Sequence, residues 1–347
     1  MLANKQRGTP VDVKSLFFRY TLDAATDFLL GTSVNSLTSP KQRFADAFGE
    51  VQRVQSIIAR AGPLNRFVPR KKFRECLKVM EEFIQPFIER TLLLSPEELE
   101  KRTKSDDGYT FLHALASYTR DRTVLRDQLT AVLLAGRDTT ACTLSWLFYE
   151  LSRRPDIVEK LRQEVYEHVG WERMPTYADL KSMRYLQHTI NETLRLYPIV
   201  PFNVRMALKD TTLPHGGGPD GNSPIGVLKN TPIGYSTVAL HRRPEIYPSQ
   251  SEEFPDHQTF EPSRWAHWTP KPWTCMSLLK NVQQIWANVM QISHSMADRE
   301  HVSGSSLPLL RSRTRPFAYF RHIRISSVEW IRNLGTKRKL YFNLSKM

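Results

Sequence analysis

Hydrophobic residues recur at helical spacing through most of the first two thirds of the chain. Between residues 11 and 32 they fall three or four positions apart, which predicts a helix that stops at Gly31. The same pattern predicts helices at about 41–60 and 71–94, separated by the breaker-rich stretch AGPLNRFVPR. A longer helix is expected from about 123 to 153, followed by two more at 155–168 and 183–197.

The pattern changes after Pro198. Short extended pieces alternate with turn residues in LPHGGGPDGNSPIGVLKNTPIGYSTVAL, which predicts hairpins beside a helical body. After about Trp273 the sequence becomes basic and loses its periodicity. The expected fold is therefore mainly α with a minor β region, in which residues 1–273 form the body and residues 274–347 form a basic tail.

Composition narrows the class of protein. With 40% hydrophobic residues in a chain of 347, a large core can form, which argues against disorder for most of the chain. The three cysteines are too scattered for a disulfide framework or a zinc site, so no metal ligands are predicted. The net charge of +14 suits an anionic membrane surface, an acidic protein or a nucleic acid. No apolar stretch reaches the roughly twenty residues that span a bilayer, which predicts a soluble or peripheral chain.

The long helix contains an unusual hexapeptide, Ala135-Gly136-Arg137-Asp138-Thr139-Thr140. Glycine inside a helix costs about 1 kcal/mol relative to alanine, so something should compensate for it. A missing side chain lets a flat cofactor approach the backbone, and an acid next to an alcohol could relay protons. The alternative is a glycine that permits helix–helix contact, with Asp138 in solvent.

A second motif, ETLR, places Glu192 and Arg195 on one helix face, where they can pair or share a third partner. Arg205 follows in PFNVRMAL, an apolar surround in which an arginine needs an anion such as a propionate or a phosphate. The alternatives are an ordinary surface pair for the first two residues and a salt bridge at a strand edge for Arg205.

These motifs carry a family resemblance. AGRDTT, ETLR, HRRPEIYP and FEPSRW occur in the order and approximate spacing found in cytochromes P450, and the resemblance covers roughly residues 9–273. The chain is most similar to fungal alkane and fatty-acid hydroxylases, whose strand region resembles residues 216–225. The resemblance implies heme, a lipophilic long-chain aliphatic substrate, and electrons from NADPH through a cytochrome reductase. It also implies a place at the cytosolic face of the endoplasmic reticulum membrane for intact relatives.

The resemblance also assigns roles on the long helix. Asp138 and Thr139 match the acid–alcohol pair that delivers protons to bound dioxygen. Ala135 and Gly136 match residues that line the oxygen groove, and Thr140 matches the next hydroxyl.

Further along the chain the resemblance assigns structural and cofactor roles. Glu192 and Arg195 match the ExxR pair, Arg264 matches the arginine that completes a buried Glu-Arg-Arg network, and Arg205 corresponds to a heme-propionate contact.

The resemblance fails at the heme-binding loop. The family pattern Phe-x-x-Gly-x-x-x-Cys-x-Gly has no counterpart here, because no glycine occurs between Gly234 and Gly304. The one cysteine in the right direction, Cys275, lies in PKPWTCMSLL and follows Arg264 too closely. The early part of the family pattern is missing too. The chain as written is therefore expected not to catalyse oxygen insertion, and a shifted reading frame or altered splice near residue 273 is the hypothesis that accounts for the change.

Two other classes of protein stay open. One is a non-catalytic remnant, such as a pseudogene product. The other is a basic protein that binds a membrane or, less favoured, a nucleic acid through tail residues Arg311, Arg313, Arg315, Arg321, Arg324 and Lys337-Arg338-Lys339.

Overall fold

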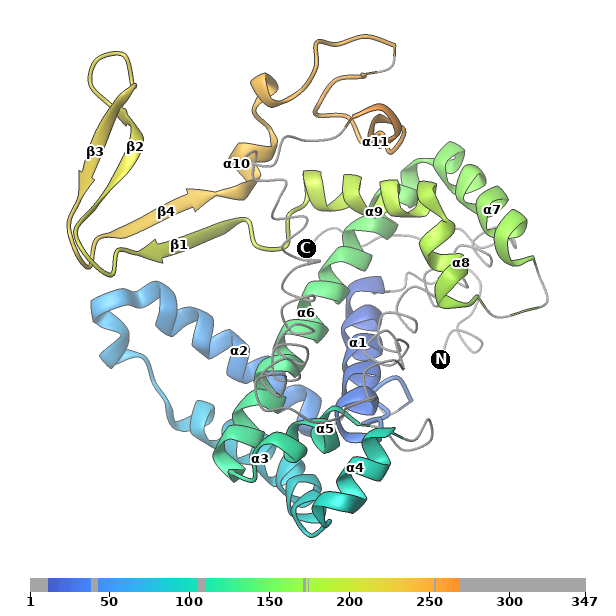
Figure 1. Cartoon of the computed structure of the whole chain (residues 1–347), viewed down its shortest axis with the longest axis vertical. Coiled ribbons are helices and arrows are strands. Elements are labelled where there is room, and N and C mark those ends of the chain that lie inside the picture. Colours follow the sequence, from blue (N-terminus) through green and yellow to red (C-terminus); the bar gives the residue numbers. More distant parts are fainter. Residues whose placement is uncertain are drawn as a thin grey trace, which may run out of the picture. The chain divides into compact units, whose positions relative to one another are not determined.

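A computed structural model describes residues 12–38, 43–104, 110–170, 173, 175–252 and 254–268 (Figure 1). The described chain divides after Arg184 into two compact units. The predicted boundary at residue 273, the tail and Cys275 lie outside the described residues.

The first unit is helical. Its elements are α1 (Val13–Leu30), α2 (Arg43–Ala61), the 3-10 helix η1 (Gly62–Phe67), α3 (Lys71–Leu92), α4 (Pro96–Lys104), α5 (Phe111–Tyr118), α6 (Arg122–Arg153), α7 (Pro155–Val169) and α8 (Tyr177–Ser182). The long helix α6 packs along α1 and contacts α3, while α2 packs on α3. Leu22, Phe48, Ile88, Leu125 and Leu129 are among the fully buried side chains of the shared core.

Polar side chains set where these helices begin and end. The Asp12 carboxylate accepts from the Ser15 amide at 2.9 Å and caps α1, and Gly31 ends that helix with a left-handed φ of 74°. Asp121 caps α6 by accepting from the amides of Thr123 and Val124. The helices expected from long hydrophobic periodicity are confirmed, with ends that shift by no more than a few residues. The short helices α4, α5 and α8 were not expected, because fewer than ten residues carry too little periodicity.

The second unit follows with α9 (Arg184–Leu196), whose first residue closes the first unit, and the strands β1 (Phe202–Met206), β2 (Thr211–Gly217), β3 (Ser223–Val227) and β4 (Pro232–Ser236). It ends with α10 (Thr237–His241), the 3-10 helix η2 (Pro244–Ile246) and α11 (Arg264–His267). β1 pairs antiparallel with β4, and β2 with β3. Gly218 and Gly221 have positive φ angles in the turn between β2 and β3, as does Gly216 near the end of β2. The predicted hairpins and the mainly α fold with a minor β region are confirmed.

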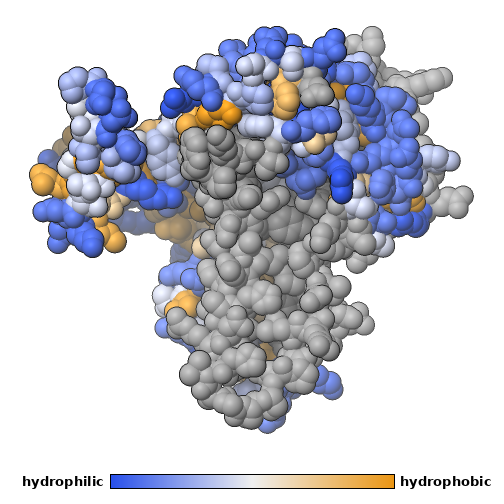
Figure 2. All heavy atoms as spheres, turned by 45° about the horizontal axis from the view of Figure 1, so that its top comes forward, coloured by the Kyte–Doolittle hydropathy of each residue, from blue (hydrophilic) through white to orange (hydrophobic). Residues whose placement is uncertain are grey.

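The strand region exposes many apolar side chains, seen as orange spheres at the left of Figure 2. On β1, Phe202 is 60% exposed, Val204 46% and Met206 58%, and Leu208 and Leu228 on the loops between strands are more exposed still. Within the described residues, no helix has the length and hydrophobicity needed to cross a bilayer.

The cap of α6 provides a test of the fold. Replacing Asp121→Ala leaves two amides of the first turn without their acceptor, so the free energy of unfolding should fall by about 1 kcal/mol. Urea denaturation followed by circular dichroism measures the change. Gln128→Ala, at an exposed position of the same helix, is the matched control and should leave stability nearly unchanged. Equal stability of the two variants would contradict the assigned start of α6.

Candidate functional site

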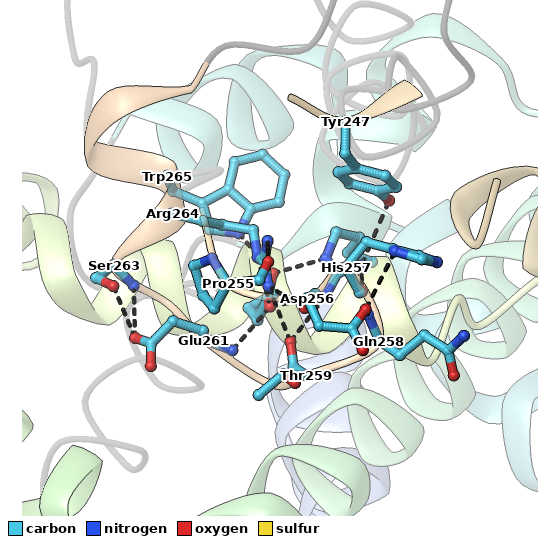
Figure 3. Close-up of polar contacts among 12 residues, drawn as sticks. Tyr247, Pro255, Asp256, His257, Gln258, Thr259, Glu261, Ser263, Arg264 and Trp265 are labelled. Atoms are coloured by element: carbon cyan, nitrogen blue, oxygen red, sulfur yellow. Dashed lines mark hydrogen bonds and ion pairs between the residues drawn. The ribbon is translucent and has the colours of Figure 1, made fainter. Parts of the chain in front are cut away.

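A single carboxylate organises the second unit by binding Glu261, Arg264 and Trp265, which are labelled in Figure 3. Glu192 on α9 has no exposed side-chain surface and accepts five hydrogen bonds. Two come from Arg195, at 2.7 and 2.8 Å, and one from Arg264 at 3.0 Å. The other two come from the Trp265 indole and the Glu261 amide, each at 2.9 Å. The grouping expected for Glu192, Arg195 and Arg264 is therefore present in the structure.

The two guanidinium groups carry one positive charge more than the carboxylate offsets. Backbone carbonyls accept their remaining N–H groups: Arg195 donates to His257 and Thr259, and Arg264 donates to Pro255, Asp256 and Thr259, at 2.5–3.2 Å. Segment 255–259 thus wraps its carbonyl oxygens around two buried cations. This arrangement ties an irregular segment to the end of α9 and leaves few donors in the network unsatisfied.

An aromatic ring packs against Arg195. Its guanidinium lies 5.3 Å from the ring centre of Tyr247, which stacks on His257 and contacts Trp268. The Tyr247 hydroxyl donates to the His241 carbonyl, and burial raises its pKa above the ordinary value. Sequence reasoning missed the hydrogen bond of Trp265, although its place directly after Arg264 in FEPSRW was a signal that it lies close to the network.

The AGRDTT stretch lies within α6, as expected, and the helix continues through it. Gly136 is buried, and the Thr139 hydroxyl donates to the Ala135 carbonyl at 2.7 Å. Thr140 is partly buried. The Thr139 hydroxyl proton is used in this hydrogen bond to the helix backbone, and the hydroxyl oxygen can accept a further hydrogen bond.

Asp138 is linked to a neighbouring helix. Its side chain is 31% exposed and accepts a hydrogen bond from the side-chain amide nitrogen of Gln52 on α2. The side-chain oxygen of Gln52 accepts a hydrogen bond from Arg137 at 3.1 Å. The Arg137 guanidinium lies 5.1 and 4.9 Å from the rings of Phe18 and Phe48. Asp138 is thus not simply in solvent, as the alternative interpretation of this motif required. Gln52 was missed because nothing in the sequence relates two residues separated by 86 positions.

Burial raises the pKa of the Asp138 carboxyl, and the charge of Arg137 and the hydrogen bond from Gln52 oppose that rise. The carboxyl therefore holds its proton more tightly than an aspartate in water does. This property suits a group that donates a proton.

Arg205 corrects one expectation. Its side chain was expected in an apolar surround, but it is exposed. The apolar neighbours Val204 and Met206 on β1 are exposed as well, so they do not bury it. The guanidinium donates to the Asn203 side chain and the Val204 carbonyl at 3.1 and 3.2 Å. Across the described ranges, no carboxylate forms an ion pair with it. The proposed salt bridge at a strand edge is therefore not seen there.

Each unit, taken by itself, offers groups whose chemistry suits a heme. In the second unit Arg205 is an accessible cation that suits a propionate, and in the first unit α6 carries the acid and the alcohol. The free cysteines that the structure describes are Cys76 on α3 and Cys142 on α6, and in this part of the chain no three metal-ligating residues cluster. Cys142 is partly buried, and burial raises the pKa of its thiol, which disfavours the thiolate that iron requires. The described residues thus supply no fitting axial ligand.

The buried carboxylate makes a sharp prediction for stability. Glu192→Gln removes the carboxylate that pairs with both buried guanidinium groups, so the free energy of unfolding should fall by about 3–5 kcal/mol. Glu245→Gln is the control, because Glu245 pairs with Arg243 at the surface and its loss should cost at most about 1 kcal/mol. Urea denaturation monitored by tryptophan fluorescence compares them. Similar midpoints for the two variants would show that the network is not the anchor of this unit.

Comparisons with known proteins identify the family of this chain. A family model described as Cytochrome P450 matches residues 2–270. Cytochrome P450 monooxygenase pvhE of Talaromyces variabilis is 56% identical over 264 residues, which cover 76% of this chain and 49% of that protein. Cytochrome P450 52A13 of Debaryomyces hansenii is 43% identical over 276 residues, or 75% of this chain and 52% of the relative. Cytochrome P450 52A10 of Candida maltosa is also 43% identical, over 74% and 52% of the two chains. The chain spans about half the length of these curated relatives, and it belongs to the cytochrome P450 family.

Proposed function

We propose that this chain carries the proton-delivering helix and the structural core of a heme-thiolate monooxygenase that acts on long-chain aliphatic substrates. The observation that carries the proposal is the acid–alcohol pair of Asp138 and Thr139 within α6, in a chain of this family. The substrate class rests on the likeness of the strand region to fungal alkane and fatty-acid hydroxylases.

Each residue has a defined task in this proposal. Asp138 holds a proton on its partly buried carboxyl, and the Thr139 oxygen accepts a hydrogen bond from a water molecule beside α6. Ala135 and Gly136 leave room next to the helix, and Thr140 supplies a further hydroxyl. Heme, when bound, supplies the oxygen-activating chemistry.

Binding of the cofactor and of the electron donor follows from charge. Arg205 is the group proposed to pair with a heme propionate. Electrons come from NADPH through a cytochrome reductase, and the net charge of +14 suits both an acidic reductase and an anionic membrane. We place the protein on the cytosolic side, at the endoplasmic reticulum membrane or peripheral to it.

We also propose that residues 1–347 do not catalyse oxygen insertion by themselves. Heme chemistry of this kind would need a cysteine thiolate to hold the iron and to supply electron density to it. Cys275 lacks the glycines whose amides stabilise such a sulfur, and it follows Arg264 by only 11 residues. A non-catalytic remnant is therefore the second candidate function, favoured by the absence of the glycine-rich cysteine pattern from this sequence.

A spectrum tests the proposed lack of activity. After the purified chain is supplied with heme, its reduced carbon-monoxide difference spectrum should show no thiolate-type band, and no fatty acid should be hydroxylated when reductase is added. Cys275→Ser should change nothing, and Cys76→Ser is the matched control. A thiolate-type band that Cys275→Ser abolishes, together with hydroxylation, would overturn the proposal.

A chimera tests the proposed proton delivery. We expect residues 2–270, placed in the matching segment of cytochrome P450 52A13, to support fatty-acid hydroxylation. Asp138→Asn in that chimera should slow turnover by roughly 100-fold, which is the lower range for a lost proton donor. Asp127→Asn, at an exposed position of the same helix, is the control. Equal rates for both variants would exclude the proposed role of Asp138.

A further inference from the structure

Gln52 on α2 joins two charged residues of α6. Its side-chain amide donates to one oxygen of Asp138, while its carbonyl oxygen accepts from Arg137 at 3.1 Å. Arg137 and Asp138 also lie 3.4 Å apart. We propose that Gln52 is a positioning residue, which holds the Asp138 carboxylate beside the Arg137 guanidinium and couples the position of α2 to this acid. The catalytic meaning of this contact rests on the proposed function, but the contact itself does not.

An uncharged amide is the side chain that this place requires. One half of an amide donates hydrogen bonds and the other half accepts them, so Gln52 satisfies an anion and a cation at once. A carboxylate at this position would repel Asp138, and an ammonium group would repel Arg137. The contact is therefore chemically specific.

The Arg137 side chain is held in place by its surroundings. Its side chain is only 10% exposed, and its guanidinium lies over the ring of Phe18 on α1 and the ring of Phe48 on α2. Phe48 and Gln52 are four residues apart, so both project from the same face of α2 onto Arg137. A shift of α2 would therefore loosen the ring contact and the amide contact together.

The proton affinity of Asp138 should follow this contact. The charged or titratable groups near the Asp138 carboxyl are Arg137 and Cys142, which lies one turn further along α6, and Lys14 on α1 acts on Cys142. The Gln52 hydrogen bond favours the charged carboxylate and opposes the effect of burial. Loss of that donor, by mutation or by movement of α2, should raise the pKa of Asp138 and make its proton harder to release.

The experiment follows carboxyl groups by NMR in the full chain without heme. Asp138 is labelled with carbon-13 and assigned by the signal that Asp138→Asn removes. In the unmodified chain, the side-chain amide signals of Gln52 should shift with the same midpoint as the Asp138 carboxyl. Gln52→Leu should raise that midpoint by roughly one pH unit, and Gln52→Glu should raise it further, because a second carboxylate repels the first. Gln55→Leu, at an exposed position of α2, should leave it unchanged.

Two results would overturn the inference. One is a Gln52 amide signal that ignores the ionisation of Asp138, which is measured in the unmodified chain and so does not depend on the folding of any variant. The other is a midpoint in Gln52→Leu equal to that in Gln55→Leu. Because no heme is present, failure of the chimera to oxidise fatty acids would reject the proposed function and leave this result untouched.

Discussion

The burial of the Glu192 carboxylate between two guanidinium groups is the constraint on which the second unit depends. Moving a charged side chain from water into the protein interior costs roughly several kcal/mol per ion. That cost is offset only when the ion pair has good geometry and its remaining donors and acceptors form hydrogen bonds. Here Arg195, Arg264 and Trp265 supply side-chain donors, and the carbonyls of segment 255–259 take up the remaining guanidinium N–H groups. An irregular segment with little secondary structure is thereby held in one conformation.

The first unit uses buried charge in a different way. Arg137 and Asp138 are neighbours on one helix, and their partners Phe18, Phe48 and Gln52 come from two other helices. A helix that carries charge on an inward face must place it against polar or aromatic groups. Of these partners, Gln52 contacts both charged residues, while the two rings contact Arg137. The packing of α6 against α2 and the position of the Asp138 carboxyl are therefore linked through Gln52.

The segment that shows the cytochrome P450 family and the missing cysteine pattern are different parts of the sequence. The residues proposed to deliver protons and the buried Glu192 network lie in the segment that matches the family, residues 2–270. The cysteine thiolate that would hold a heme iron belongs to a glycine-rich pattern that this sequence does not contain. The proposed proton-delivery residues would not replace that ligand, because a proton donor supplies no electron density to the iron.

The sequence by itself determined the long helices, the hairpins and the grouping of Glu192 with Arg195, because these depend on periodicity, turn residues and local spacing. The family motifs also placed Arg264 in the same network. Only the tertiary structure decided that the Gln52 side chain contacts Asp138. It also decided that Trp265 and the Glu261 amide donate the remaining hydrogen bonds to the Glu192 carboxylate, and that Arg205 is exposed. Such contacts join residues far apart in the chain or depend on what covers a strand. Local patterns carry no information about either, because both are set by how the elements pack.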